Sequence, residues 1–442
     1  MSYLHSKTLH EPRATEASRL TPEALLAHYD AIRQRTLDLS APLEPEDCVI
    51  QSMPEASPTR WHLAHTSWFL ETFVLAEAEA DYKPFHPGYD ALFNSYYETV
   101  GAPFPRPSRG LLSRPTVVEV LEYRDHVDRR MRTLLRREVG CLSQSLLAVV
   151  ELGLNHEEQH QELILTDIKH ALAQNPLHPI YREKAMSKHE PSTELSWTRF
   201  EPGLCKVGHD GKGFAFDNET PRHRQYLHGY ELGTRLVTCG EYIEFIEDGG
   251  YERPELWLAE GIGLARSQGW RAPLYWKRDG GRWMEFSLHG MNRVRDSEPV
   301  GHVSYFEADA FARWSGARLP TEVELEYAVE SMPVDGNFLE SDEFHPRPST
   351  SGPGTLDQLF GDLWEWTSSS YAAYPGYRAP GGALGEYNGK FMCNQYVLRG
   401  GSCATSKRHL RSTYRNFFPA DARWQFSGIR LARAPLSRSE SS

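Results

Sequence analysis

The sequence has few cysteines, and they are widely scattered. None of its six cysteines forms a Cys-x-x-Cys spacing; they are Cys48, Cys141, Cys205, Cys239, Cys393 and Cys403. This distribution argues against both a disulfide framework and a cysteine-based zinc site. A metal site in this chain would therefore have to use histidine.

Long apolar runs and blocks of basic residues are also missing. No stretch of 18 apolar residues occurs, and the first 20 residues lack the apolar core of a signal peptide. Lys and Arg number 48 against 60 Asp and Glu, which gives a formal net charge of -12. Such a chain is not expected to bind nucleic acid or an anionic membrane. We expect a cytoplasmic protein that acts on small molecules.

The 442 residues suffice for two or more domains, and their character changes near residue 195. Four stretches with a helical apolar period precede that point: 21–40, 60–78, 114–137 and the segment around 156–160. Short strands, glycines and tryptophans follow it, interrupted by one predicted helix over 303–330. We therefore predict a multidomain α and α+β protein with a four-helix bundle (1–185), a second domain (195–435) and a disordered tail (436–442).

The most informative segment is His156-Glu157-Glu158-Gln159-His160. At about 100° per residue, His156 and His160 lie roughly 40° apart on a helix. Apolar residues and Asp167 share that face, so the two imidazoles are expected to be buried. A metal ion would satisfy both rings, and hydrogen bonds to neighbouring carboxylates are the alternative.

The same letters spell HExxH, the zinc metalloprotease signature. A metzincin would have Gly at 163 and His at 166, where this chain has Leu163 and Thr166. A thermolysin-like enzyme would place a ligand glutamate near 180, where the nearest is Glu183. The protease interpretation is therefore disfavoured, and Glu157 becomes an ordinary helix residue about 100° from His156.

A bundle site needs a third ligand from a facing helix, and the second helix offers His62 and His65. His65 is favoured because it lies among Trp61, Trp68 and Phe69 on the helical wheel, although either histidine would also fit an aromatic core. Three neutral imidazoles suit Zn, Fe, Cu or Ni, so the ligand type alone does not choose the metal.

Five further residues near this segment have suitable chemistry. Tyr96 and Tyr97 can donate protons, Arg106 and Arg109 can hold a substrate carboxylate, and the amide of Gln159 can reach a ligand of the metal. Each also has a structural interpretation: an aromatic loop anchor for the tyrosines, and a solvated surface side chain for the arginines and the glutamine.

The C-terminal half resembles the formylglycine-generating-enzyme (sulfatase-modifying factor) domain, which has a C-type-lectin-like fold. The resemblance lies in DNETPRHRQYLHGYELG, EPVGHVSYFEADAFARWSGARLPTEVELEYA, FGDLWEWTSS, VLRGGSCATSKRH and WQFSGIRLAR. The catalytic cysteines of those enzymes would fall near Thr405 and Leu410. Copper-cysteine chemistry is therefore not expected.

The N-terminal half resembles the DinB-like bundle, and the fusion, with WHLAH and HEEQH, resembles the ergothioneine-biosynthesis sulfoxide synthases. That resemblance implies non-haem Fe(II) bound by His65, His156 and His160. It also implies that Gln159 contacts hercynine, the betaine of histidine. The segment YRNFFPADARWQFSG corresponds to the family's active-site loop, which suggests Asn416, Phe417 and Phe418 as further substrate contacts.

The family reaction joins hercynine to a thiol with O2 and gives a sulfoxide, with Tyr96 or Tyr97 as proton donor. Phe418 and the tyrosine pair resemble the branch that uses L-cysteine, and γ-glutamylcysteine is the alternative thiol. A zinc hydrolase, a DinB-type thiol transferase and a non-enzymatic binding module remain further alternatives. The sequence does not fix the thiol, the oligomeric state or which tyrosine acts.

Overall fold

The structure is a computed structural model that describes residues 22–136, 142–184, 191–352 and 354–435. These residues form two compact units. The first contains the chain through Ala171 together with His209–Pro221 and Ala373–Met392, and the second contains the remainder. The tail predicted to be disordered, 436–442, lies outside the described residues.

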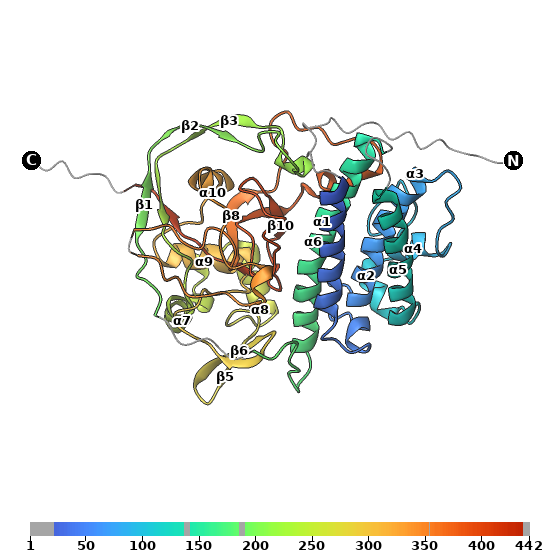
Figure 1. Cartoon of the computed structure of the whole chain (residues 1–442). Helices are drawn as coiled ribbons and strands as arrows, with labels where there is room; N and C mark the ends of the chain where they lie inside the picture. Colours follow the sequence, from blue (N-terminus) through green and yellow to red (C-terminus); the bar gives the residue numbers. More distant parts are fainter. Residues whose placement is uncertain (1–21, 137–141, 185–190, 353, 436–442) are drawn as a thin grey trace, which may run out of the picture. The chain divides into compact units, whose positions relative to one another are not determined.

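Four long helices of the first unit run side by side (Figure 1): α1 (Pro22–Ser40), α2 (Thr59–Leu70), α5 (Val117–Leu135) and α6 (Gln144–Ala173). They confirm the four predicted helices. Thr116 caps α5, since its side chain accepts the Glu119 N–H and the Glu119 carboxylate accepts the Thr116 N–H. None of the described helices is long and apolar enough to cross a lipid bilayer.

Short elements lie between these helices: η1 (Asp47–Val49), the π-helical turn η2 (Glu71–Leu75), α3 (Ala76–Ala78), α4 (Tyr89–Phe93) and η3 (Arg106–Leu111). The same unit also contains η4 (Asp217–Glu219), η8 (Ala383–Glu386) and η9 (Gly389–Phe391), which come from later in the chain.

A charged network lies inside the bundle and corrects the interpretation of Glu157 as an ordinary helix residue. Its side chain is fully buried, with Arg33 Nη1 2.9 Å from Oε2 and Arg124 Nη2 2.5 Å from Oε1. Burial alone would raise the pKa of Glu157, but Arg124 and Arg33 outweigh it and lower the pKa to about 2. Glu157 points away from the histidines, as predicted, and ties α6 to α1 and α5.

The second unit is built from small sheets and short helices. One sheet has the order β1-β4-β12 and another the order β10-β9-β8-β11, beside the pair β2-β3 and the meander β5-β6-β7. The strands are β1 (Trp197–Phe200), β2 (Gly203–Val207), β3 (His223–Leu227), β4 (Tyr230–Gly233), β5 (Trp276–Asp279), β6 (Arg282–Ser287), β7 (Gly290–Arg293), β8 (Trp364–Ser370), β9 (Gln395–Arg399), β10 (Asn416–Pro419), β11 (Ser427–Gly428) and β12 (Ala432–Arg433).

The single helix predicted over 303–330 is wrong, because two helices occupy that stretch. They are α9 (Tyr305–Trp314) and α10 (Glu322–Val329). Gly316 follows α9 with φ +71°, a left-handed conformation that ends helices, and Thr321 begins α10 with a capping box to Glu324. The other helical elements of this unit are α7 (Cys239–Glu247), α8 (Ala259–Ser267), η5 (Gly250–Glu252), η6 (Pro254–Leu256) and η7 (Leu339–Ser341).

Two connections from the C-terminal half of the sequence belong to the helical unit. The predicted domains, 1–185 and 195–435, are continuous stretches and did not include this exchange. The two connections join β2 to β3 and β8 to β9. The second is tied to the helical unit by the Glu386 carboxylate, which accepts the Thr99 hydroxyl at 2.7 Å. Lys390 Nζ adds a hydrogen bond to the Tyr96 carbonyl at 2.5 Å.

Candidate metal centre

Three buried histidines of the helical unit converge, as the sequence predicts. His65 comes from α2, and His156 and His160 lie one turn apart on α6. The Nε2 atom of His156 lies 3.1 Å from that of His65 and 3.0 Å from that of His160. The helical spacing of four residues and the facing helix together bring the three nitrogens to one point.

The outer ring nitrogens of two of these histidines have defined partners. His65 Nδ1 lies 2.6 Å from the Phe93 carbonyl oxygen, to which it can only donate. His160 Nδ1 lies 2.8 Å from His62 Nδ1, and His62 Nε2 lies 3.1 Å from Asp167 Oδ2. His62, the alternative third ligand, therefore lies behind His160, and it is not part of the converging group.

Burial keeps these imidazoles neutral. It lowers the pKa of His65 and of His160 well below the usual value, and it lowers the pKa of His156 to about 3. A neutral imidazole is the form that binds a metal. Two imidazole nitrogens held by one ion at about 2.1 Å and at right angles lie about 3 Å apart. Both measured separations match, so this residue set fits a metal ion.

Two tryptophans hold the ring of His65. Trp61 stacks on it with centroids 4.5 Å apart and planes at 13°, and Trp68 stacks at 5.6 Å and 18°. The indole nitrogens are anchored in turn, by the Leu92 carbonyl at 3.0 Å and by Asp90 Oδ1 at 2.9 Å. The orientation of His65 on α2 is therefore fixed by its neighbours.

The two predicted substrate arginines have different environments. Arg109 is buried, with its guanidinium carbon 3.4 Å from the Trp61 ring centroid and Nη1 donating to Ser57 Oγ at 2.9 Å. Burial, together with the neighbouring Arg106, lowers the pKa of Arg109. Arg106 is exposed and donates to the Glu55 carbonyl. Only Arg109 contacts the aromatic shell around His65.

Of the two predicted tyrosines, Tyr97 is the more deeply buried. Its ring lies 5.8 Å from that of Trp68 and 6.4 Å from that of Phe69, and Phe69 lies 4.8 Å from His156. The Tyr96 ring is tilted against that of Tyr97, with centroids 4.7 Å apart, and makes an edge contact with Phe391 of η9 at 5.1 Å. Burial raises the pKa of both phenols, so both stay protonated at neutral pH.

Gln159 has a partner that sequence reasoning missed. Tyr387, from the connection between β8 and β9, donates its hydroxyl to Gln159 Oε1, and its ring lies 5.6 Å from that of His156. Phe216 stacks on Tyr387 at 5.5 Å and 11°. Asp217 then accepts hydrogen bonds at 2.6 Å from Tyr377 and from Asn388. The two connections thereby fix an aromatic surface beside His156.

The predicted residues Asn416, Phe417 and Phe418 lie on β10 of the second unit. Phe417 stacks on Tyr371 with centroids 4.0 Å apart, and Phe418 lies 6.1 Å from Trp424. Asn416 Oδ1 accepts the Phe417 N–H at 2.9 Å. Their role at the histidines remains a prediction.

A second group of metal-ligand residues occurs in the second unit. His345 Nε2 lies 3.1 Å from Glu298 Oε2 and 3.6 Å from Glu285 Oε1, and Arg295 Nη1 lies 3.4 Å from Glu298. The Glu298 carboxylate thus already has two partners, His345 and Arg295.

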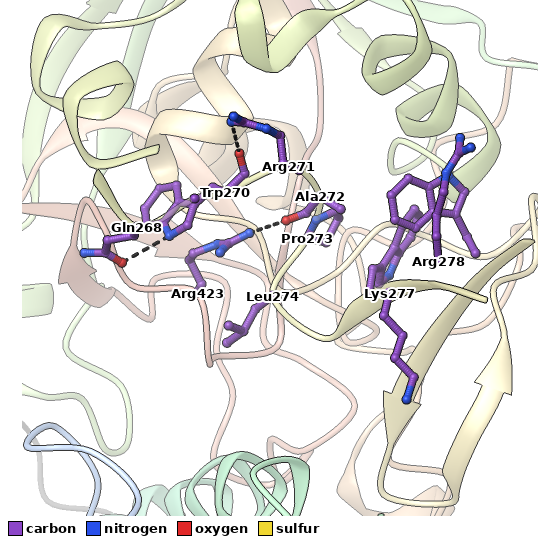
Figure 2. Close-up of a pocket in the computed structure, with 12 residues that line it drawn as sticks. Gln268, Trp270, Arg271, Ala272, Pro273, Leu274, Lys277, Arg278 and Arg423 are labelled. Carbon is purple, nitrogen blue, oxygen red and sulfur yellow. Dashed lines mark hydrogen bonds between the residues drawn. The ribbon is translucent and has the colours of Figure 1, made fainter. Parts of the chain in front are cut away.

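A hollow of about 410 Å³ also belongs to the second unit (Figure 2). Its lining includes Arg423, which lies 4.3 Å from the Trp270 ring centroid and pairs with Glu307 at 2.7 Å. It contains none of the predicted site residues, and its buried cation already has a carboxylate partner.

Both halves of the chain match known families. Residues 28–164 match the DinB superfamily, and residues 183–351 and 349–435 match the sulfatase-modifying factor enzyme 1-like domain. These matches confirm the predicted fold class, a DinB-like helical part followed by a formylglycine-generating-enzyme-like domain.

Whole-length relatives were also found. The chain is 31% identical to the hercynine oxygenase of Mycobacterium tuberculosis over 93% of this chain and 99% of the relative. It is 31% identical to the hercynine oxygenase of Mycolicibacterium smegmatis over 93% of this chain and 98% of the relative. Ergothioneine biosynthesis protein 1 of Schizosaccharomyces pombe is 26% identical over 50% of this chain and 28% of that protein.

Proposed function

We propose, on the premise that this chain belongs to the hercynine oxygenase family, that it is an Fe(II)-dependent sulfoxide synthase joining hercynine to L-cysteine with O2. The product is hercynylcysteine sulfoxide, a step of ergothioneine biosynthesis. One oxygen atom ends on sulfur and the other leaves as water, while the imidazole C–H and the thiol S–H supply the two hydrogens. O2 thus accepts two electrons in carbon–sulfur bond formation and two in sulfoxidation.

The observation that carries this proposal is the convergence of three neutral Nε2 atoms at His65, His156 and His160. Iron held there would supply coordination positions for the thiol sulfur, the hercynine imidazole and O2. The protein binds that ion through nitrogen alone and keeps the surroundings apolar with Trp61, Trp68 and Phe69. A water-poor site strengthens the charge interactions of the reacting groups.

Hercynine carries a trimethylammonium group, which cannot donate a conventional hydrogen bond. Aromatic faces and amide oxygens are suitable partners for it. Gln159, whose amide is oriented by Tyr387, and Tyr387 itself offer both beside His156. Asn416, Phe417 and Phe418 are proposed as further hercynine contacts because they match the family's active-site loop.

The thiol substrate carries a carboxylate, and Arg109 is proposed to bind it. A buried guanidinium that has no direct ion pair, with only the more distant charge of Asp167 to stabilise it, gains much from an anionic ligand. Arg106 is proposed as a second, solvent-exposed contact. L-cysteine is preferred to γ-glutamylcysteine because Phe418 stands where the dipeptide-using relatives tend to have an aspartate.

Tyr97, or Tyr96 behind it, is proposed as the proton donor to a reduced oxygen species. Both phenols are protonated at neutral pH, as a donor must be. Proton delivery favours carbon–sulfur bond formation over simple oxidation of the thiol.

The test is anaerobic reconstitution with Fe(II), followed by oxygen uptake with hercynine, with thiol, and with both. Uptake that requires both substrates, with hercynylcysteine sulfoxide identified by mass, supports the proposal. A reaction that contains cysteine and γ-glutamylcysteine at equal concentrations identifies the preferred thiol from the mass of the product. His160→Ala should lose iron and turnover, whereas His170→Ala is a matched control on α6, because His170 bonds Ser52 outside the converging group. Zinc retention with hydrolysis or thiol transfer would contradict the proposal.

A further inference from the structure

His62 and Asp167 form a hydrogen-bonded pair behind one of the proposed metal ligands. His62 Nε2 lies 3.1 Å from Asp167 Oδ2, and His62 Nδ1 lies 2.8 Å from His160 Nδ1. All three side chains are buried. The Ser57 N–H also donates to Asp167 Oδ2, at 2.8 Å, and holds that carboxylate in place.

The direction of these hydrogen bonds follows from the carboxylate. An ionised Asp167 only accepts, so His62 carries its proton on Nε2. The Nδ1 atom of a neutral His62 then has a lone pair and accepts the Nδ1–H of His160. This leaves the lone pair of His160 on Nε2, the atom that lies 3.0 Å from His156 Nε2. With the opposite tautomer, His160 would present an N–H to the other two histidines and could not bind an ion.

We infer that His62 and Asp167 are positioning residues that set the tautomer and orientation of His160 for metal binding. This inference rests on the proposed function, since it requires an ion at the three histidines. Phe93 has the same role for His65 through its carbonyl oxygen. The carboxylate of Asp167 adds a negative charge behind His62. This charge makes the Nε2 lone pair of His160 a stronger ligand for a cation.

Two substitutions of His62 separate this role from packing. His62→Gln retains an acceptor for His160 Nδ1–H and a donor for Asp167, whereas His62→Leu retains only the volume. We expect His62→Leu to weaken Co²⁺ and Fe²⁺ binding by about 10–100-fold in chelator competition, with His62→Gln much closer to the wild type. Asp167→Asn should lie between them, because an amide oxygen still accepts but carries no charge.

The readouts are the metal dissociation constant and the visible absorption spectrum of the Co²⁺ protein. A change of ligand set or orientation at His160 alters that spectrum, and a packing defect elsewhere does not. Circular dichroism and thermal melting of the metal-free variants confirm the fold. If His62→Leu fails to fold, the comparison of Asp167→Asn with His62→Gln tests the same role.

Two failures can be told apart. If the wild type binds no Co²⁺, or binds it equally after His156→Ala, the proposed metal centre is wrong. If the wild type binds through the three histidines and His62→Leu matches it in affinity and spectrum, the positioning role is wrong. Equal losses for His62→Gln and His62→Leu would also contradict the tautomer argument.

Discussion

The guanidinium carbon of Arg109 lies 3.4 Å from the ring centroid of Trp61, and in the described residues this buried cation has no carboxylate within ion-pair distance, although the more distant charge of Asp167 acts on it. Its Nε atom is buried without a hydrogen bond there. Replacing Arg109 with Met removes a buried charge that lacks a direct carboxylate partner and keeps most of the volume. We expect Arg109→Met to raise the KM for the thiol at least tenfold while iron content is unchanged.

The same substitution should stabilise the substrate-free protein. Burial disfavours the charged form of Arg109, so its removal should raise the unfolding free energy by about 1–3 kcal/mol. Thermal melting without substrates measures this. Arg106→Met is the comparison, with little effect on stability because Arg106 is exposed. A larger KM effect from Arg106→Met than from Arg109→Met would contradict the assignment of the carboxylate to Arg109.

The tyrosine pair should control the product. With Tyr97→Phe we expect a shift from the sulfoxide towards cysteine sulfinate, because the proton that favours carbon–sulfur bond formation is lost. Tyr96→Phe should have a smaller effect, since Tyr97 is the tyrosine that packs on Trp68 and Phe69. Product ratios by mass spectrometry provide the measurement, and an unchanged ratio in both variants would refute a proton-donor role.

Tyr387 should affect the binding of hercynine and leave the binding of the thiol unchanged. Tyr387→Phe removes the hydroxyl that orients Gln159 and retains the aromatic ring beside His156. We expect the KM for hercynine to rise several-fold, with iron content and the KM for cysteine unchanged. Tyr377→Phe, which loses the hydrogen bond to Asp217, provides a graded control with a smaller effect of the same sign. A change confined to the thiol KM would contradict this role.

Sequence reasoning found the three converging histidines because their positions follow from helical spacing and a facing helix. His156 and His160 are four residues apart, Asp167 continues the same face, and the second helix offers two histidines. Tyr387 could not be found in this way, since 228 residues separate it from Gln159 and the contact depends on a connection without a motif. The helical angle of about 100° per residue also predicted that Glu157 points away from His156. Its burial could not be predicted in this way, because it depends on Arg33 and Arg124 from two other helices.

The buried carboxylate of Glu157 should make stability depend on acid pH. Its pKa in the folded protein is about 2, below the value of about 4.3 for an unfolded glutamate. The ionised side chain therefore contributes its full stabilisation above about pH 4.3, and this is lost as the pH falls towards 2. Glu157→Gln leaves Arg33 and Arg124 without their shared carboxylate and should cost about 3–5 kcal/mol at pH 7. The difference between wild type and variant, measured by denaturant unfolding, should shrink below pH 4; a constant difference would contradict the assigned pKa shift.

Metal binding should stabilise the folded protein through the three histidines. The Nε2 atom of His156 lies 3.0 Å from that of His160 and 3.1 Å from that of His65, separations that one ion can bridge. Unfolding separates His65 from the α6 pair, and the ion then loses its site. At a free iron concentration one hundred times the dissociation constant, linkage predicts a gain of about 2.7 kcal/mol. Anaerobic melting with and without Fe(II) measures it, and His156→Ala should abolish the gain while His170→Ala retains it. Equal gains in both variants would mean that the ion binds elsewhere.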